Sequence, residues 1–364
     1  MRILAIDIGT GTQDILLFDS DGPVENSVQL IMPSPTLRTA QQVRAATAQH
    51  KPIALDGVLM GGGPCHWAIN DHLAAGLAVY ATPNSARTFD DDLEKVVAMG
   101  IQLREAPTEE QDVQHITLRD LDLAAITTAL QAFGVAPVWD VLAVAVFDHG
   151  NAPPNISDRK FRFDYLADRL KQGGWLTDLA FTRADIPAEM TRLQAVAATA
   201  PMDTPLVVMD TAPAAVLGAL DDPVVAAQRE VIVANIGNFH ALAFHLADGT
   251  IRGLFEHHTG ELQPDQLHTF LVRLAQGTLT NDEIFYSQGH GALVLDATPS
   301  ANALLATTGP RQALLKTWEP AAAAPYRAVP HGDMMLTGCF GLVRAVAAKL
   351  PLYQAAIEAC LGGA

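Results

Sequence analysis

The segment AIDIGTGTQDILLFDSDG, residues 5–22, decides the organisation of this chain because a second segment repeats it. The second segment is VANIGNFHALAFHLADG, residues 233–249. In both, an apolar run reaches a polar residue, breaks at a glycine two positions later and then resumes with apolar residues. Asp7-Ile8-Gly9 therefore matches Asn235-Ile236-Gly237.

This repeat predicts two β-hairpins with glycine at the tip. The first has strands at 2–8 and 13–19, and the second begins near residue 230. Asp21-Gly22 matches Asp248-Gly249, so the second copy is one residue shorter, and we place the missing residue at the hairpin tip. An internal repeat fixes the architecture. We expect two related halves, residues 1–225 and 226–364, each opening with a hairpin.

Other apolar runs predict strands that alternate with helices. Strands are expected at 27–32, 141–148 and 204–210, and helices at 36–49 and 65–78. Continuous apolar strands between helices indicate an α/β fold with parallel strands. The charged stretch near 155–200 is expected to be a helical insert in the first half.

The composition limits the classes of binding partner that we expect and indicates a cellular compartment. The formal net charge is −17 and no dense basic stretch occurs, which argues against a nucleic-acid or anionic membrane partner. Cys65, Cys339 and Cys360 lie far apart with no CxxC spacing, which favours a reducing cytoplasm. Asp7 interrupts the first apolar run, so a signal peptide is not expected. The run VLAVAVF is about a third of the length of a membrane span.

The hairpin tips have the chemistry of an anion site. Glycine lets backbone approach a phosphate closely, and successive N–H groups at a turn bind anions. The hydroxyls of Thr10 and Thr12 add donors, and Asp7 at the strand end can hold water on Mg²⁺. An ordinary β-turn is the alternative for a single copy, and the paired copy favours a ligand site.

Two further segments complete a resemblance to a known superfamily. They are VVMDTAPAAVLGALDD, residues 207–222, and MLTGCFGLVRAV, residues 335–346. With the two hairpins, they occur in the order of the phosphate, connecting and adenosine motifs of the actin, sugar-kinase and heat-shock-chaperone ATPases, and the chain resembles that superfamily. The resemblance implies two actin-like (ribonuclease H-like) domains around an interdomain cleft that binds ATP and Mg²⁺. It also implies that residues 335–346 form a strand, a glycine turn and a helix.

The resemblance also assigns residues. It implies that Asp210 is the catalytic base. Apart from the resemblance, Asp148 is a second candidate, because it ends a buried strand and strand ends in open α/β sheets face the ligand crevice. A helix cap or turn is the alternative for each. It implies Mg²⁺ contacts from Asp7 and from Asn235, where the superfamily usually carries Asp. The nucleotide-binding residues implied are Asp7, Gly9, Thr10, Gly11, Thr12, Gln13, Gly237, Asn238, Gly338 and Gly341.

The function implied is an ATP-binding phosphotransferase or ATPase that acts on an unidentified small molecule. A slow or non-catalytic ATP-dependent switch that activates a partner enzyme is the alternative, and Asn235 favours it. The third hypothesis is a structural protein that binds no nucleotide. More narrowly, the chain resembles a family named for pyruvate formate-lyase activation, although no CxxxCxxC cluster of a radical iron–sulfur enzyme is present.

Two other features stay open. GGGPCHWA, residues 61–68, lacks the third glycine of a dinucleotide loop because His66 stands there, so a tight turn lining the cleft is favoured. Several histidines lie beside glycines or acids in spacings that match no structural zinc site. We expect substrate contacts or polar loop positions rather than metal ligands, and their roles are not assigned: His66, His149, His257, His258, His290 and His331.

Overall fold

The computed structural model describes residues 1–106, 112–171, 173–300, 302–315 and 324–362. Within these ranges the chain forms two six-stranded sheets, one four-stranded sheet and thirteen α-helices. The predicted mixed α/β class is confirmed.

The first large sheet has the strand order β3-β2-β1-β8-β10-β9. Its central strand β1 is antiparallel to β2 and parallel to β8. Ile3 and Ala5 of β1 face one hydrophobic core, and Leu4 and Ile6 face another. Burial on both faces explains the unbroken apolar run. The strands are β1 (Arg2–Ile8), β2 (Thr12–Asp19), β3 (Val28–Pro33), β8 (Val141–Val146), β9 (Ala180–Thr182) and β10 (Leu206–Asp210).

The second large sheet has the order β14-β13-β12-β11-β15-β16, in which β13-β12-β11-β15-β16 corresponds to β3-β2-β1-β8-β10 of the first sheet, while β14 and β9 have no counterparts. Its strand β11 is antiparallel to β12 and parallel to β15. The alternation of buried and half-buried residues is the same in β1 and β11, and the same in β2 and β12. The central strands of the two sheets therefore pair in the same way, and the division into two related domains stays a prediction. The strands are β11 (Glu230–Ile236), β12 (His240–Ala247), β13 (Thr250–His258), β14 (Gly291–Val294), β15 (Leu304–Thr308) and β16 (Tyr326–Arg327).

The predicted place of the missing residue was wrong. The two hairpin tips have equal length, residues 9–11 and 237–239. The second copy is shorter only after its second strand, where Asp248 and Gly249 alone join β12 to β13. Both residues have positive φ, 46° and 80°, as a two-residue hairpin turn with right-handed strand twist requires.

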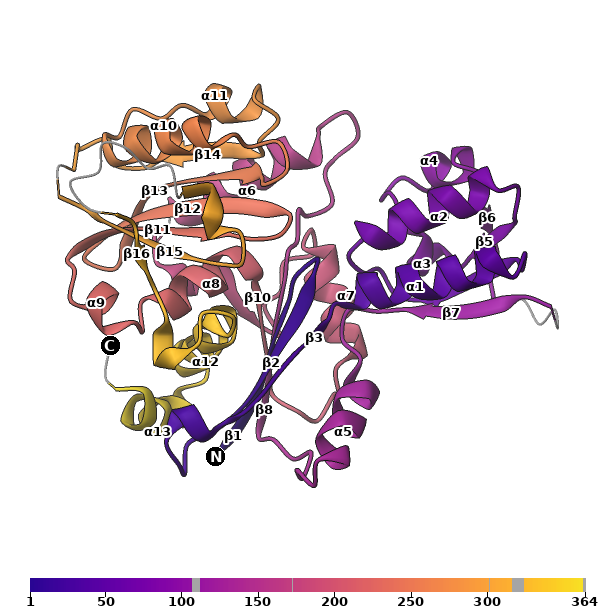
Figure 1. Ribbon diagram of the computed structural model, residues 1–364, viewed down its shortest axis with the longest axis horizontal. Helices are drawn as coiled ribbons and strands as arrows, with labels where there is room; N and C mark the ends of the chain where they lie inside the picture. Colours follow the sequence, from indigo (N-terminus) through magenta and orange to yellow (C-terminus); the bar gives the residue numbers. More distant parts are fainter. Residues whose placement is uncertain (107–111, 172, 301, 316–323, 363–364) are drawn as a thin grey trace.

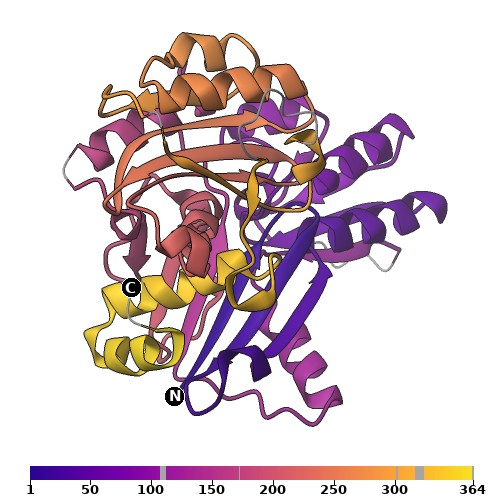
Figure 2. The same cartoon turned by 60° about the vertical axis from the view of Figure 1, so that its left-hand side comes forward.

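Two helices lie between the large sheets, and others cover their outer faces (Figures 1 and 2). The inner pair is α8 (Thr211–Ala219) and α12 (Thr337–Lys349). The outer face of the first sheet is covered by α5 (Leu123–Ala132) and α7 (Thr191–Thr199), and that of the second by α10 (Pro264–Ala275). The protein is thus layered, with one shared core around α8 and α12.

A small lobe interrupts the first half between β3 and β8 and projects from the body in Figure 1. Its parallel sheet has the order β6-β5-β4-β7 and its own core. The sequence did not reveal this separate sheet. Parallel strands between helices have the same apolar pattern whether they belong to the lobe or to the first large sheet. Its elements are α1 (Pro35–Ala48), β4 (Ile53–Gly57), α2 (Pro64–Ala74), β5 (Val79–Ala81), α3 (Pro83–Ala86), α4 (Leu93–Ala98), β6 (Gln102–Leu103) and β7 (Gln114–Leu118).

The insert expected near 155–200 is only partly helical. It contains α6 (Asp158–Leu170) and α7, but β9 lies between them and pairs with β10 at the edge of the first sheet. The remaining α-helices are α9 (Pro223–Ala226), α11 (Asn281–Phe285) and α13 (Pro351–Leu361). Across the described ranges, no helix has the length and apolar character needed to cross a membrane.

Candidate functional site

The two hairpins present matching turns to each other. The Gly9 N–H donates to the Thr12 carbonyl at 2.9 Å, and the Gly237 N–H donates to the His240 carbonyl at 2.9 Å. The tips are close, because a Cβ added to Gly11 would lie 2.6 Å from Nδ2 of Asn238. Two equivalent glycine turns therefore face one another.

A cavity of about 330 Å³ lies beside these tips, within the size range of small-molecule sites. The hairpin tips, the start of α8, the lobe and the loop after β8 all line it. Six predicted site residues are in the lining: Gly9, Thr10, Asp148, Asn235, Gly237 and Asn238. Seven others are not: Asp7, Gly11, Thr12, Gln13, Asp210, Gly338 and Gly341.

The glycine turn at 61–63 belongs to this lining, as the sequence predicted. Arg192 of α7 packs on it, since a Cβ at Gly61 would lie 2.5 Å from Nη2 of Arg192. Arg192 is also paired with the buried Asp120 at 2.7 Å and donates to the Phe147 carbonyl. The glycine thus allows a buried arginine to approach the cavity edge.

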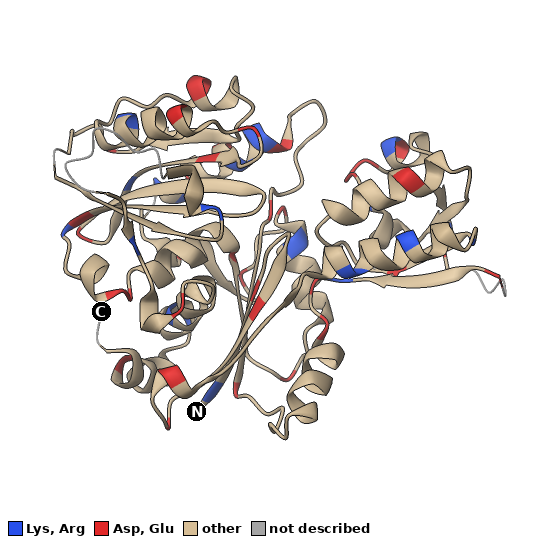
Figure 3. Cartoon of the chain, viewed as in Figure 1, with Lys and Arg blue, Asp and Glu red and all other residues tan. Residues whose placement is uncertain are grey.

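The cavity lining is rich in carboxylates. Four aspartates and two arginines contribute to it: Asp90, Asp91, Asp148, Asp158, Arg87 and Arg192. Burial raises the pKa of Asp91 to about 6. Figure 3 shows Lys and Arg scattered over many elements rather than gathered on one. An anionic ligand here needs a cation or backbone donors to balance these acids.

Asp7 lies behind the cavity and points towards α12. Its Oδ1 accepts a hydrogen bond from the Thr211 hydroxyl at 2.6 Å, and Thr211 lines the cavity. Asp14 stands opposite Asp7 in the β1–β2 ladder. Burial raises the pKa of Asp7 to about 7 and that of Asp14 to about 8. Gln13 donates to the Pro33 carbonyl at 3.0 Å, away from the cavity.

The expected strand and glycine turn at 335–346 are not formed. Helix α12 begins at Thr337, so Gly338 and Gly341 lie inside it. A Cβ at Gly338 would overlap the Asp7 carboxylate, and one at Gly341 would overlap the Ala214 carbonyl of α8. These glycines allow the helix to pack closely against β1 and α8, which produces the same sequence pattern as a turn.

The carboxylate oxygens of Asp210 and Asp148 already accept hydrogen bonds within the protein. Asp210 caps α8 through the Ala212 N–H at 2.9 Å and accepts the Asp148 N–H at 3.1 Å. The Asp148 carboxylate is 3% exposed and accepts the N–H groups of Gly150 and Leu193 at 2.9 and 2.8 Å. The helix-cap alternative is therefore realised for Asp210, and its catalytic role stays a prediction.

Arg162 is the residue that sequence reasoning missed. Its guanidinium is buried and pairs with Asp210 at 2.7 Å and Glu256 at 2.8 Å, joining the first sheet to the second. It also donates to the Asp148 carbonyl and lies 4.2 Å from the centre of the Phe147 ring. The available signal was its position one turn before Leu166, on the buried face of α6.

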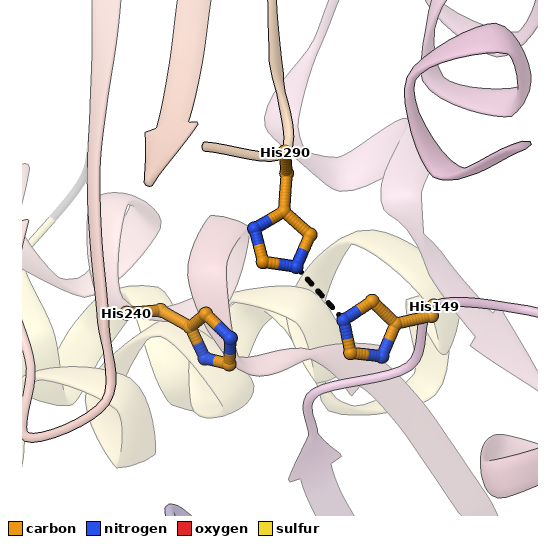
Figure 4. Close-up of side chains that lie close together, drawn as sticks. All are labelled: His149, His240 and His290. Carbon is orange, nitrogen blue, oxygen red and sulfur yellow. Dashed lines mark hydrogen bonds between the residues drawn. The ribbon is translucent and has the colours of Figure 1, made fainter. Parts of the chain in front are cut away.

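Three of the protein's histidines converge at the cavity edge, and Figure 4 shows their rings facing one another. His149 follows β8, His240 opens β12 and His290 precedes β14. Nε2 of His149 lies 2.9 Å from Nε2 of His290. Spacing along the chain gave no sign of this cluster, because its members come from three separate elements.

The other histidines noted in the sequence are held apart from this cluster or at its margin. His257 is buried and lies 2.9 Å from the Ser287 carbonyl. His331 lies 3.6 Å from Asp221, and His66 makes an edge contact with Phe89. His258 packs at the margin, 4.5 Å from His290 between ring centres.

A comparison with protein families identifies the chain. Residues 60–314, more than half of the sequence, match the family described as "Putative pyruvate format-lyase activating enzyme (DUF1786)". The chain belongs to this family. None of the curated proteins searched matches it. The matched range covers part of the lobe, the β8 and β10 strand ends and the second hairpin, and it begins after the first hairpin.

Proposed function

We propose that the chain binds ATP, or a close relative, with Mg²⁺ between its two hairpins and transfers or hydrolyses the terminal phosphoryl group. The observation that carries this proposal is the pair of equivalent glycine turns, from two sheets whose five corresponding strands have the same order, that meet beside one cavity. The actin-like superfamily has this plan of two related domains around a nucleotide cleft. Enzymes of phosphoryl transfer act mainly through positioning and electrostatics.

The cavity residues fit such a ligand in type. Gly9 and Gly237 allow close backbone approach, and Asn235 and Asn238 offer amide groups. Mg²⁺, when bound, neutralises phosphate charge, and the carboxylates of the lining suit its preference for oxygen ligands. Asp7 lies behind Thr211 and would act on the metal through water. The phosphoryl acceptor would be a small molecule near Asp148 and His149. The cytoplasmic location of the protein stays a prediction from the sequence.

Calorimetry with ATP, ADP and a non-hydrolysable analogue, each with and without Mg²⁺, tests the proposal. We expect Mg²⁺-dependent binding to the wild-type chain. Gly9→Val should abolish it because a side chain at the tip occupies the place of the phosphate. A Cβ there would lie 3.3 Å from the Thr12 carbonyl, a tight contact, so circular dichroism checks that the variant is folded. Gly22→Val is the matched control, since nothing lies within 4 Å of a Cβ at Gly22. Failure of every nucleotide to bind at millimolar concentration would refute the proposal.

A slow ATP-dependent switch is the second candidate. The hydrogen bonds of Asp210 and Asp148 favour it, because every carboxylate oxygen of both residues already accepts at least one hydrogen bond within the protein. The family description, which names an activating enzyme, agrees with a partner enzyme as the target. Asp210→Asn separates the two: a phosphotransferase loses at least about a hundredfold in turnover. A switch shows low turnover before and after the substitution, together with an ATP-dependent change in protease sensitivity.

A further inference from the structure

Three imidazoles meet at one point although they come from three separate elements. His149 belongs to the first half, and His240 and His290 belong to the second. One ring nitrogen of each lies within 4.8 Å of those of the other two. In Figure 4, the His290 ring lies above the other two, with His240 on one side and His149 on the other. The cluster therefore spans the boundary between the two halves.

Two of the nitrogens are hydrogen-bonded to each other, Nε2 of His149 and Nε2 of His290 at 2.9 Å, and a bound metal would replace that hydrogen bond. Within the described chain, Nε2 of His240 is buried and has no hydrogen-bond partner. Imidazole binds metals in its neutral form.

The surroundings suit a cation. The Glu256 carboxylate lies 3.3 Å from Nδ1 of His290 without a hydrogen bond, near the place from which a carboxylate orients a metal-binding histidine. The nearby Arg162 is balanced by two acids, Asp210 and Glu256, so it does not leave the site positive. Phe147 stacks on His240 with ring centres 4.0 Å apart and fixes its orientation.

We propose that His149, His240 and His290 bind one divalent first-row transition metal, of which Zn²⁺ and Co²⁺ are the test cases. Three imidazoles suit such metals, whereas Mg²⁺ prefers oxygen. Nitrogens of a tetrahedral zinc site lie about 3.4 Å apart, so the His149–His290 pair, at 2.9 Å, would open slightly while the other pairs, which lie within 4.8 Å, would close onto the metal.

The fourth coordination position of such a metal would face the cavity. His149 and His240 line the cavity, so a metal held by the three rings would have its open side towards that space. Three protein ligands with one open position is the arrangement of catalytic zinc sites. The site would thus take water or an anionic group of whatever occupies the cavity. This proposal does not depend on nucleotide binding.

The test uses the full chain, stripped with a chelator and free of nucleotide. We expect one Co²⁺ per chain with the strong visible absorption of four-coordinate cobalt, and its displacement by one Zn²⁺. His240→Gln and His290→Gln should each weaken binding by at least about a hundredfold, beyond the 10–100-fold typical of losing a second-shell partner. The exposed His115 of β7 provides the control, and His115→Gln should bind as the wild type does.

Two results would overturn the proposal. One is a folded wild-type chain that takes up neither Co²⁺ nor Zn²⁺ in stoichiometric amount. The other is unchanged affinity in both glutamine variants, verified as folded by circular dichroism. The wild-type cobalt spectrum decides the matter even if a variant fails to fold, because absence of the four-coordinate absorption is sufficient to reject the site.

Discussion

The two halves of the molecule share a backbone frame and differ in what they carry on it. Asp7 and Asn235 occupy the same place in their hairpins, but Asp7 faces Asp14 across its ladder while Asn235 faces Leu242. The first hairpin thus pairs a buried carboxylate, that of Asp14, with the half-buried carboxylate of Asp7, whereas the second pairs a half-buried amide with an apolar side chain. The comparison shows that topology was retained while the chemistry of equivalent positions diverged.

The inner helices show the same relation most directly. A Cβ at Gly218 of α8 would overlap the Thr337 carbonyl of α12, and a Cβ at Gly341 of α12 would overlap the Ala214 carbonyl of α8. Each glycine also faces the backbone nitrogen of the other. The crossing is therefore symmetric, and the two halves meet through equivalent residues.

The largest expected effect comes from breaking this crossing. Gly341→Val should cost more than about 4 kcal/mol of unfolding free energy or prevent folding, because its Cβ has backbone rather than a movable side chain in its way. If the halves are equivalent, Gly218→Val should cost a similar amount. Chemical denaturation measures both, with Gly22→Val as a control expected to change little. A loss of stability in only one of the two variants would show that the two glycines, although equivalent in position, do not contribute equally to the free energy of unfolding.

The second effect concerns the ion pair that joins the halves. Arg162→Met leaves Asp210 and Glu256 buried without their cation and should cost about 3–5 kcal/mol. Lys160→Met on the same helix removes only a surface pair with Asp164 and should stay within about 0.5 kcal/mol. Equilibrium unfolding compares the two. A loss below about 1 kcal/mol for Arg162→Met would mean that the helix crossing alone holds the halves together.

The parts of this structure that local pattern encodes were predictable. The hairpins, the central apolar strands and the repeated plan follow from spacing of apolar residues and glycines within short segments. The separate lobe could not be predicted in this way, because the periodicity of apolar residues indicates whether a strand is buried and not which sheet it joins. The glycines of α12 were misread, because close helix packing and a turn both require glycine.

The candidate site was only partly predictable for a related reason. The turns of Gly9 and Gly237 line the cavity as expected. Arg162 and the histidine cluster depend on contacts between elements far apart in sequence, and His149 and His290 are 141 residues apart. No local pattern carries that information. The Asp210 position shows the converse, since its motif indicated a base and the fold surrounds it with a cap and an ion pair.

The smallest expected effect separates the two hairpins by pH. Asp14 is 7% exposed and its Oδ1 has no hydrogen-bond partner within the described chain. Burial, and then the charge of Asp7, raise its pKa to about 8, against about 3.9 for an unfolded aspartate. Between those values unfolding releases a proton, so rising pH favours the unfolded chain. Leu242, at the equivalent place in the second hairpin, has no such dependence.

Asp14→Asn should therefore flatten the pH profile. We expect the free energy of unfolding of the chelator-treated wild type to fall as pH rises from about 4 to about 8, and then to level off above the folded pKa. The variant should lose less stability across that window and be more stable at pH 8 by about 1–3 kcal/mol, since it buries no carboxylate that must ionise. Asp203→Asn, at an exposed position, is the control and should leave the profile unchanged. Urea unfolding at several pH values measures the difference. Parallel profiles for wild type and Asp14→Asn would show that the acid pair of the first hairpin is solvated and that the two hairpins differ less than their burial indicates.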